Sequence, residues 1–410
     1  MDKRYVCPKC GYEASADERS DSPECPRCGA LLNEERGDGT PTVLDKVREA
    51  ARGRLNVERV SSNGQVVSVD LGSTEPDYDA VRSAFSPMGY DAFARERNGR
   101  YYAFLVERHE EGKGTFSRPI VYIGLFIATV LSTIYAGYTL SLPLVEEGLM
   151  DNVWNGALSF SFGLLAILGC HEMGHKIQSI RSGIDSSWPY FIPMPFLPLG
   201  TLGALIKMKS AIPTNDDAIK VGAAGPLIGV AVAIPVTIIG MRLSYIVPGS
   251  AFGEGSFTLG SSLLFMALSE LSISVPQGMN VWIHPLAFAG WVGLFVTMLN
   301  LLPAGQLDGG HVTRAIFGQR GHQLISKLVV RVLMFIGILG LLSESGFLNL
   351  GQYTWSGWLI WGFIAYFITR GGHPGPLNEL KPLSTTSRVI GILALVTFIL
   401  CFVPVPIQIA

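Results

Sequence analysis

Charged residues are scarce in this sequence, and most of them lie outside long apolar runs. Only 16% of the 410 residues are Asp, Glu, Lys or Arg, whereas 48% are hydrophobic. Uncharged apolar runs of about 20 residues recur in the second two-thirds of the sequence, and they exclude a wholly water-soluble chain. The net charge is −2 without a basic stripe, so nucleic acid is not expected as a partner. The sequence predicts a polytopic α-helical membrane protein with a soluble N-terminal part.

Cysteine is also rare, and four of the six cysteines form two CxxC pairs. Fourteen residues separate the pairs, a spacing typical of a tetrahedral structural zinc site formed by Cys7, Cys10, Cys25 and Cys28. A pair of disulfides is the alternative, which a reducing cytoplasm disfavours. Cys170 and Cys401 lie within or at the ends of apolar runs and are expected to be packing residues. The start, MDKRYVCPKC, has no apolar signal-peptide core, so no cleaved signal is expected.

Two alternating stretches in the soluble part each surround an Asn-Gly dipeptide. Residues 54–72 and 90–107 therefore predict two β-hairpins, because Asn-Gly accepts the positive φ angles of a two-residue turn. Residues 76–89 between them predict a helix, which gives a small ββαββ domain without a catalytic constellation. Such a domain is expected to dock a protein partner or to regulate. The predicted domains are a zinc ribbon (1–35), a linker running into a short helix (36–53), the small α+β domain (54–112) and a transmembrane domain (119–410).

Several uncharged windows reach the roughly 20 residues that a membrane span requires. A further window near 324–343 carries Lys327 and Arg331 at one end, where basic side chains can extend to the headgroups. The segment 259–272 is too short and is interrupted by Glu270, so it is expected to be interfacial. The sequence predicts seven spans in the bilayer, near 119–145, 152–170, 221–241, 271–307, 324–343, 346–369 and 389–410.

Basic residues in the short loops predict the orientation. Lys113 and Arg118 precede the first span, whereas 145–152 after it contains no base, so the N-terminal part is expected on the cytoplasmic side. Arg242 is an exception, on the outer side. With seven spans the C-terminus would lie outside. The other cytoplasmic loops carry Lys176, Arg181, Arg314, Arg320, Arg370, Lys381 and Arg388.

The second span ends in the pattern HExxH, formed by His171, Glu172 and His175. Positions i and i+4 share a helix face, so both imidazoles can bind one metal ion, and Glu172 can act as a general base on a water molecule. A chance match on a solvated helix is the alternative. The apolar residues before His171 argue against it, because ionisable groups at membrane depth are costly without a function.

A catalytic zinc site usually has three protein ligands, so a third is expected elsewhere in the membrane region. Asp308 is the candidate, because it is the only carboxylate between Glu270 and the end of the fourth span, and Pro303 and neighbouring glycines should break the helix there. His311 is the competing ligand, although it lies closer to the aqueous loop. His284 is expected to be a satisfied or interfacial histidine.

These motifs resemble the site-2 protease family of intramembrane zinc metalloproteases. The resemblance rests on HEMGH at 171–175 and on Asn300, Pro303, Asp308 and Gly309 in the pattern NxxPxxxxDG, and it covers about 119–340. The soluble N-terminal part and the segment GTLGALIKMKSAIP resemble the branch with plant chloroplast, archaeal and bacterial members. The resemblance implies a core of three spans and cleavage of a transmembrane or membrane-proximal helix. It also implies that His171, His175 and Asp308 hold zinc and that Glu172 is the base.

Asn300 lies two turns before Asp308. Its amide is placed to hydrogen-bond the substrate or the developing oxyanion, and the alternative is that it caps the broken helix.

An apolar but proline-broken segment, 188–210, follows the second span and cannot cross the membrane as one helix. We expect it to be re-entrant, with an exposed strand edge at 200–208 that holds an unwound substrate by β-augmentation. The alternative is an interfacial loop that only plugs the site. The predicted substrate-binding residues are Gly200, Thr201, Leu202, Gly203 and Ala204.

Two further motifs receive no catalytic role. AAGPLIG at 223–229 resembles a Gly-Pro motif of the family, but Gly229 stands where many members have Asn, so helix packing through small residues is expected. GGHPGP at 371–376 lies in a predicted cytoplasmic loop.

The sequence as a whole predicts a membrane protease with one catalytic and one structural zinc ion and with transmembrane proteins as substrates. A metal transporter is a second hypothesis, but a transit path would need further acceptor groups along the spans. A pseudoprotease is a third, and the intact Glu172 argues against it.

Overall fold

The computed structural model describes residues 4–6, 13–15, 33–35, 42–62, 65–108, 119–249, 257–350 and 353–409. The chain divides into two compact units. One comprises Met1–Glu111 together with Pro376–Pro382, and the other comprises Gly112–Gly375 together with Leu383–Ala410.

The first unit begins with a small antiparallel sheet of order β2-β1-β3. Its strands are β1 (Arg4–Val6), β2 (Glu13–Ser15) and β3 (Asn33–Glu35). The four cysteines of the predicted zinc ribbon lie outside the described residues, so the structural zinc site stays a prediction.

A second antiparallel sheet of the same unit has the order β4-β5-β7-β6. Its strands are β4 (Arg59–Ser62), β5 (Val66–Gly72), β6 (Tyr90–Arg97) and β7 (Arg100–Glu107), and α2 (Tyr78–Phe85) with the short 3-10 helix η2 (Ser86–Met88) connects β5 to β6. Asn98 and Gly99 form the turn between β6 and β7 with φ angles of 53° and 73°. Asn63 and Gly64 lie outside the described residues.

Helix α1 (Val43–Ala51) packs on this second sheet. Thr42 and Asp45 form a capping box at its start. Val47 and Ala51 are buried in the same core as Phe85. The folded domain therefore begins before residue 54, because the amphipathic helix placed in the linker contributes to the domain's core.

Residues Pro376–Pro382 cover the free edge of β6. The amide of Ala94 donates to the carbonyl of Leu377 at 2.7 Å, and Ala94 forms a parallel bridge with Asn378. Arg95, which is buried, forms an ion pair of 3.2 Å with Glu379. A segment more than 280 residues later in the sequence thus protects a sheet edge that would otherwise expose unpaired backbone groups.

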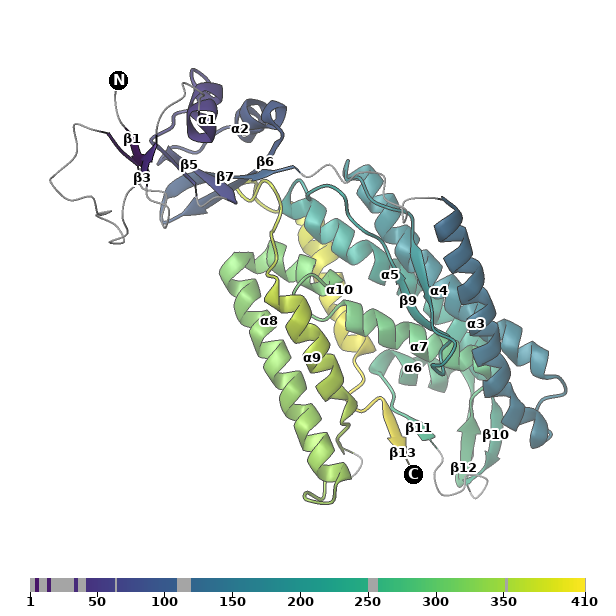
Figure 1. Ribbon diagram of the computed structural model, residues 1–410. Coiled ribbons are helices and arrows are strands. Elements are labelled where there is room, and N and C mark those ends of the chain that lie inside the picture. Colours follow the sequence, from purple (N-terminus) through teal and green to yellow (C-terminus); the bar gives the residue numbers. More distant parts are fainter. Residues whose placement is uncertain are drawn as a thin grey trace. The chain divides into compact units, whose positions relative to one another are not determined.

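Four helices in the described part of the second unit are long and apolar enough to cross a membrane: α3 (Pro119–Glu146), α4 (Val153–Arg181), α5 (Asn215–Arg242) and α8 (Asp308–Glu344). At 1.5 Å per residue each exceeds the roughly 30 Å thickness of the hydrocarbon core. Helix α8 is kinked at Gly318, where φ is 66°. Figure 1 shows α3 beside α4 and α8 beside α9, and both pairs make extensive contacts. This unit is membrane-embedded.

The remaining apolar helices are shorter than the roughly 20 residues of a membrane span. They are α6 (Leu263–Ser272), α7 (Pro285–Asn300), α9 (Gly357–Arg370) and α10 (Thr385–Cys401). At α7 and α10 the chain is extended over part of the predicted span: β12 (Met279–Trp282) lies within 271–307 and pairs with β10 (Tyr245–Pro248), and β13 (Ile407–Ile409) lies within 389–410 and pairs with β11 (Phe257–Leu259). Lack of charge in a window indicated a helix where the chain is extended. The count of seven spans stays a prediction.

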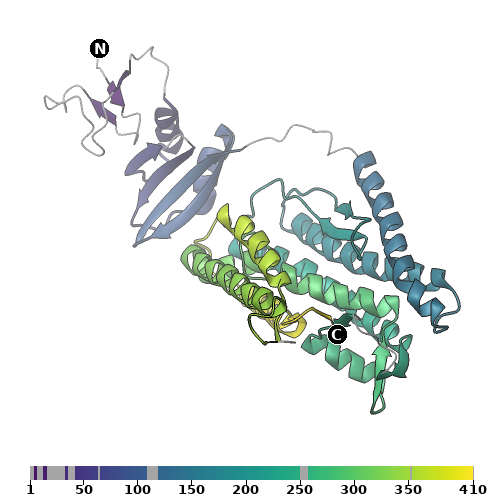
Figure 2. The same cartoon turned by 60° about the horizontal axis from the view of Figure 1, so that its bottom comes forward.

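The core of the second unit surrounds α7. This helix contacts α4, α5 and α10, and Leu294 and Met298 on it are fully buried. The indole of Trp291 donates to the carbonyl of Gly260 at 2.7 Å. In the rotated view α7 again lies among these helices, and the α8–α9 pair lies along one side of the same unit (Figure 2). This packing fixes the end of α7, which leads into the candidate site.

Strands β8 (Tyr190–Pro193) and β9 (Thr201–Leu205) form a two-stranded antiparallel hairpin within 188–210. Gly200 has a φ of 70° and lies against α3, where the hydroxyl of Ser132 donates to its carbonyl at 2.6 Å. Among the described residues, β9 pairs only with β8, so its other edge is unpaired.

Candidate metal centre

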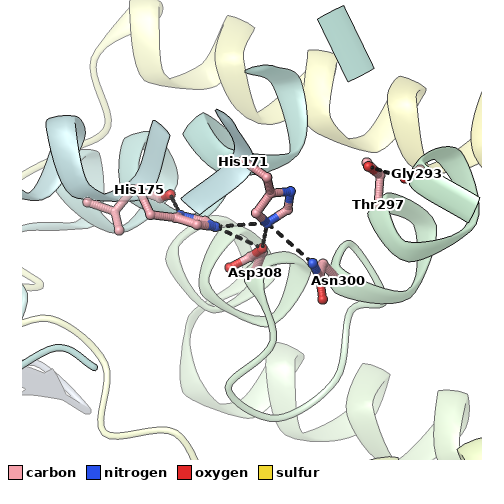
Figure 3. Close-up of polar contacts among 7 residues, drawn as sticks. His171, His175, Gly293, Thr297, Asn300 and Asp308 are labelled. Atoms are coloured by element: carbon pink, nitrogen blue, oxygen red, sulfur yellow. Dashed lines mark hydrogen bonds and ion pairs between the residues drawn. The ribbon is translucent and has the colours of Figure 1, made fainter. Parts of the chain in front are cut away.

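Helix α4 carries His171 and His175 one turn apart, so both rings point in the same direction. The ring centroids are 4.9 Å apart. Figure 3 shows both rings directed at Asp308, which is the first residue of α8. His171 is buried and His175 is half-buried.

The position of Asp308 follows from a helix break. Helix α7 ends at Asn300 and α8 begins at Asp308, so the predicted break occurs in the seven residues between them. Gly309 and Gly310 permit this sharp reversal, because a Cβ at Gly309 would lie 2.8 Å from the carbonyl oxygen of Leu302 and a Cβ at Gly310 would lie 3.0 Å from that of Ala304. The sequence DGG therefore lets the loop lie flat against the first turn of α8.

The three side-chain atoms that could bind a metal lie at similar distances from one another. His175 Nε2 is 3.2 Å from His171 Nε2 and 3.2 Å from Asp308 Oδ2, and His171 Nε2 is 3.4 Å from Asp308 Oδ2. Tetrahedral zinc with bonds of about 2.0 to 2.1 Å separates neighbouring ligand atoms by about 3.3 to 3.4 Å. Among the described residues, these three form the one His, Cys and carboxylate group that could hold a metal ion.

The hydrogen bond of His175 to α5 leaves Nε2 of this ring available to bind a cation. His175 Nδ1 lies 2.8 Å from the carbonyl oxygen of Val221, which can only accept, so Nδ1 carries the proton. In neutral His175 the lone pair of Nε2 then faces His171 and the carboxylate of Asp308. Two acceptors, His175 Nε2 and the carboxylate of Asp308, then face each other 3.2 Å apart and repel unless a cation or a proton lies between them. A backbone partner that fixes the tautomer is typical of histidine ligands.

Three glycines on one face of α5 allow this close approach. A Cβ at Gly225 would overlap the imidazole of His175, with Cε1 at 2.7 Å. A Cβ at Gly229 would lie 3.1 Å from His171 Nδ1, and one at Gly222 would lie 2.8 Å from the carbonyl oxygen of Asp308. Gly225 also leaves the Val221 carbonyl uncovered, because a helical side chain extends over the turn before it.

Glu172 lines the same cavity as the three donor groups. The cavity measures about 190 Å³, and Glu172 is 6% exposed. A carboxylate buried next to a candidate metal position is placed to exchange protons with a water molecule in the cavity.

A comparison with known families covers this part of the chain. Residues 159–343 match Peptidase family M50. This segment is a peptidase family M50 domain.

The M50 domain contains His171, Glu172, His175 and Asp308, together with the hairpin β8–β9. Helices α9 and α10 and the first unit lie outside the matched residues.

Similar proteins include curated plant proteins named as probable zinc metalloproteases. The chain is 29% identical over 325 residues to "Probable zinc metalloprotease EGY1, chloroplastic" of Arabidopsis thaliana, with 73% of this chain and 55% of the relative covered. It is 27% identical over 285 residues to "Probable zinc metalloprotease EGY2, chloroplastic" of Oryza sativa subsp. indica, with 67% and 48% covered. The chain spans about half the length of the curated relatives it matches.

A solved structure, "Site-2 Protease from Methanocaldococcus jannaschii", is 15% identical with a TM-score of 0.30. The match covers 63% of this chain and 93% of that chain.

Asn300, the last residue of α7 in the M50 domain, faces the donor atoms. Its Nδ2 lies 3.2 Å from His171 Nε2 (Figure 3). One turn earlier, Thr297 satisfies its hydroxyl within α7 by donating to the carbonyl of Gly293 at 2.8 Å. The amide of Asn300 is thus directed at the centre.

The predicted substrate-binding residues of β9 are divided between two cavities of the M50 domain. Ala204 lines the cavity of the candidate centre, as does Leu205. Thr201, Leu202 and Gly203 line an apolar cavity of about 290 Å³. Gly200 precedes the strand and packs on α3 instead. Asn300 and Leu307 line both cavities, so the cavities adjoin at the end of α7.

The competing ligand His311 lines the cavity, but its Nδ1 lies 2.9 Å from Nε2 of His373. His373 belongs to GGHPGP, to which sequence reasoning gave no role. The one feature of the sequence that points to His373 is a histidine between Gly and Pro in a loop. The position of that loop depends on the packing of α9 against α8, which the local sequence does not encode. His284 accepts the amide of Leu286 at 3.1 Å as the N-cap of α7, away from the candidate centre.

Proposed function

We propose that this protein is an intramembrane zinc metalloendopeptidase that cleaves peptide bonds in or near transmembrane helices of substrate proteins. The observation that carries the proposal is the spacing of His171 Nε2, His175 Nε2 and Asp308 Oδ2, which lie 3.2 to 3.4 Å from one another as tetrahedral zinc requires. Glu172 borders the same cavity. The names of the plant relatives support zinc as the metal.

The chemistry assigned to the metal is Lewis acidity: a zinc ion held by His171, His175 and Asp308 would polarise the scissile carbonyl and acidify water. The protein groups would perform the remaining steps. Glu172 accepts the proton of the attacking water and later returns a proton to the leaving amine. The amide of Asn300 donates to the scissile carbonyl oxygen as negative charge develops on it.

Strand β9 addresses a problem specific to helical substrates, whose carbonyls are held in internal hydrogen bonds. An unwound substrate can pair with the free edge of β9 through main-chain hydrogen bonds. The part of a paired substrate strand that lies beside Ala204 and Leu205 would be next to the candidate centre. The part that lies beside Thr201, Leu202 and Gly203 would be next to the apolar cavity. Apolar substrate side chains beside the cleaved bond fit this arrangement.

The soluble part is proposed to lie on the cytoplasmic side, because Lys113 and Arg118 precede α3 and 145–152 carries no base. A structural zinc ion on Cys7, Cys10, Cys25 and Cys28 and recruitment of a protein partner by the ββαββ domain belong to the same proposal.

The test is cleavage of a panel of single-span reporter proteins in liposomes by the full chain, with zinc measured in every sample. The Glu172→Gln variant should keep wild-type zinc content and lose cleavage by about 10²- to 10⁴-fold. Glu270→Gln, at an exposed carboxylate of α6, is the matched control and should cut like the wild type.

Cleavage by Glu172→Gln at the wild-type rate would refute the role of Glu172. Zinc-loaded wild type that cuts no reporter would refute the protease proposal, and metal flux in sealed vesicles would then test the transporter.

A further inference from the structure

The cavity of the candidate centre has a third histidine, His311, whose protonation pattern is determined by a chain of hydrogen bonds. The chain begins in the loop between α9 and α10. The backbone amide of Gly375 lies 2.9 Å from Nδ1 of His373. An amide N–H can only donate, so His373 Nδ1 is the acceptor and the proton of this ring resides on Nε2.

The second link connects His373 to α8. His373 Nε2 lies 2.9 Å from Nδ1 of His311, and the rings are nearly perpendicular with an interplanar angle of 82°. Since His373 donates here, His311 Nδ1 accepts. The proton of neutral His311 is therefore on Nε2, the other side of the ring.

Burial keeps this arrangement neutral. The pKa of His373 is lowered to about 2 by burial and by the neighbouring side chains of His311, His322 and Arg314. His322 stacks edge-on against His373 with centroids 5.3 Å apart, and its Nδ1 contacts the hydroxyl of Thr313 at 3.1 Å. The Thr313 hydroxyl also donates to the carbonyl of Gly309 at 2.9 Å.

The loop that carries His373 is held to the loop that precedes Asp308. Gln306 donates from Nε2 to the carbonyl of Gly372 at 3.1 Å. Gly305, with a φ of 54°, packs directly against Ile368 at the end of α9. These contacts fix His373, and through it the ring of His311, relative to the start of α8.

The ring of His311 is buried and lines the cavity shared by His171, Glu172, His175 and Asp308. We propose that His311 is a second electrophilic residue of this site, which donates its Nε2 proton in a hydrogen bond to the scissile carbonyl oxygen, and that His373 is a positioning residue that fixes the tautomer. The inference rests on the proposed protease function. A preorganised neutral donor stabilises a developing oxyanion without costly reorganisation.

The test uses matched pairs of variants in the full chain. Gln can place an amide N–H near the position of histidine Nε2, whereas Leu has a similar size and no donor. His311→Leu should lower kcat by about 10²- to 10³-fold with KM and zinc content unchanged, and His311→Gln should recover part of the loss. His373→Leu should lower kcat by about 10- to 100-fold, and His373→Gln should recover part of it.

Two further measurements separate a positioning role from a structural one. The double variant His311→Leu/His373→Leu should have the kcat of His311→Leu alone, because His373 acts only through His311. In ¹⁵N-histidine-labelled wild type, the His311 spectrum, assigned by its absence in His311→Gln, should show a protonated Nε2 and an unprotonated Nδ1. Glu270→Gln, at an exposed carboxylate of α6, is the control and should keep the wild-type kcat.

The outcomes are distinct. Three results would overturn the inference while the protease proposal stands. They are a wild-type kcat in His311→Leu, a double variant whose loss of kcat is the product of the two single losses, and a proton on His311 Nδ1. Loss of zinc in His311→Leu would assign His311 to the metal instead. Zinc-loaded wild type that cuts no reporter would refute the protease function and, with it, the catalytic role of His311.

Discussion

Replacing Gly225 by alanine places a methyl group in the space occupied by the imidazole of His175. The Cβ would overlap that ring, with Cε1 at 2.7 Å, and ordinary van der Waals contact begins near 3.4 Å. Helix α5 cannot retreat easily, because it is also packed against α7 and α10. The ring of His175 must therefore move by about 1 Å.

A movement of this size is large relative to what a metal ligand tolerates. Metal–ligand distances in a working site vary by about 0.2 Å. The displaced ring also loses its 2.8 Å contact with the Val221 carbonyl, and loss of such an outer partner costs about 10- to 100-fold in metal affinity or activity on its own. We expect Gly225→Ala to lower zinc affinity by more than 100-fold and to abolish cleavage.

The assay measures zinc per chain after dialysis against a chelator of graded concentration, alongside reporter cleavage. Gly229→Ala is the graded comparison: its Cβ would lie 3.1 Å from His171 Nδ1, so a shift of about 0.3 Å suffices, and we expect zinc to be retained with at most a tenfold loss of kcat. Gly124→Ala in α3, with open space around it, should behave like the wild type. Full zinc binding and activity in Gly225→Ala would refute the steric argument.

Three other predictions concern different contacts. Asn300→Ala should retain zinc and lower kcat by about 10²- to 10³-fold in the reporter assay, because it removes a donor near the scissile carbonyl; a change in stability alone would instead indicate a helix cap. Glu379→Gln should weaken the protected edge of β6 by about 2 kcal/mol, since it removes the charged partner of the buried Arg95, and this corresponds to roughly 30-fold faster hydrogen exchange in β6 of the full chain. A reporter with an N-methylated main chain beside the scissile bond should lose affinity if it pairs with β9, and unchanged KM would argue against that pairing.

The parts of the candidate site that sequence predicts are those fixed by local geometry. The spacing of His171 and His175 places them on one helix face wherever the helix lies. The break before Asp308 follows from Pro303 and the glycines around it, and the structure confirms that α7 ends before Asp308. Contact between Asp308 and the two histidines could be predicted on one further assumption, that both segments lie at the same depth in the membrane. Their roles as zinc ligands stay a prediction.

Uncharged windows in the sequence do not predict where the helices begin and end. Residues 271–307 and 389–410 are uncharged, yet β12 and β13 occupy part of each. Hydropathy measures how well a segment tolerates an apolar environment and does not distinguish a buried helix from a strand paired at its edge. The partners of these strands, β10 and β11, lie at least 31 residues away in the sequence, and no local pattern encodes that pairing.

The glycines of α5 show that the effect of a departure from a family pattern depends on the space around the residue concerned. From the sequence alone, glycine at position 229 in place of the Asn of many family members predicts only helix packing through small residues. In the structure the face formed by Gly222, Gly225 and Gly229 packs against Asp308, His175 and His171, so each missing Cβ is a distance requirement of the candidate centre. The requirement is strict at Gly225, where a methyl group overlaps the imidazole, and loose at Gly229, where a few tenths of an ångström suffice. A larger residue at position 229 is therefore compatible with a metal site if the ring of His171 shifts slightly, whereas no side chain at position 225 leaves His175 in place.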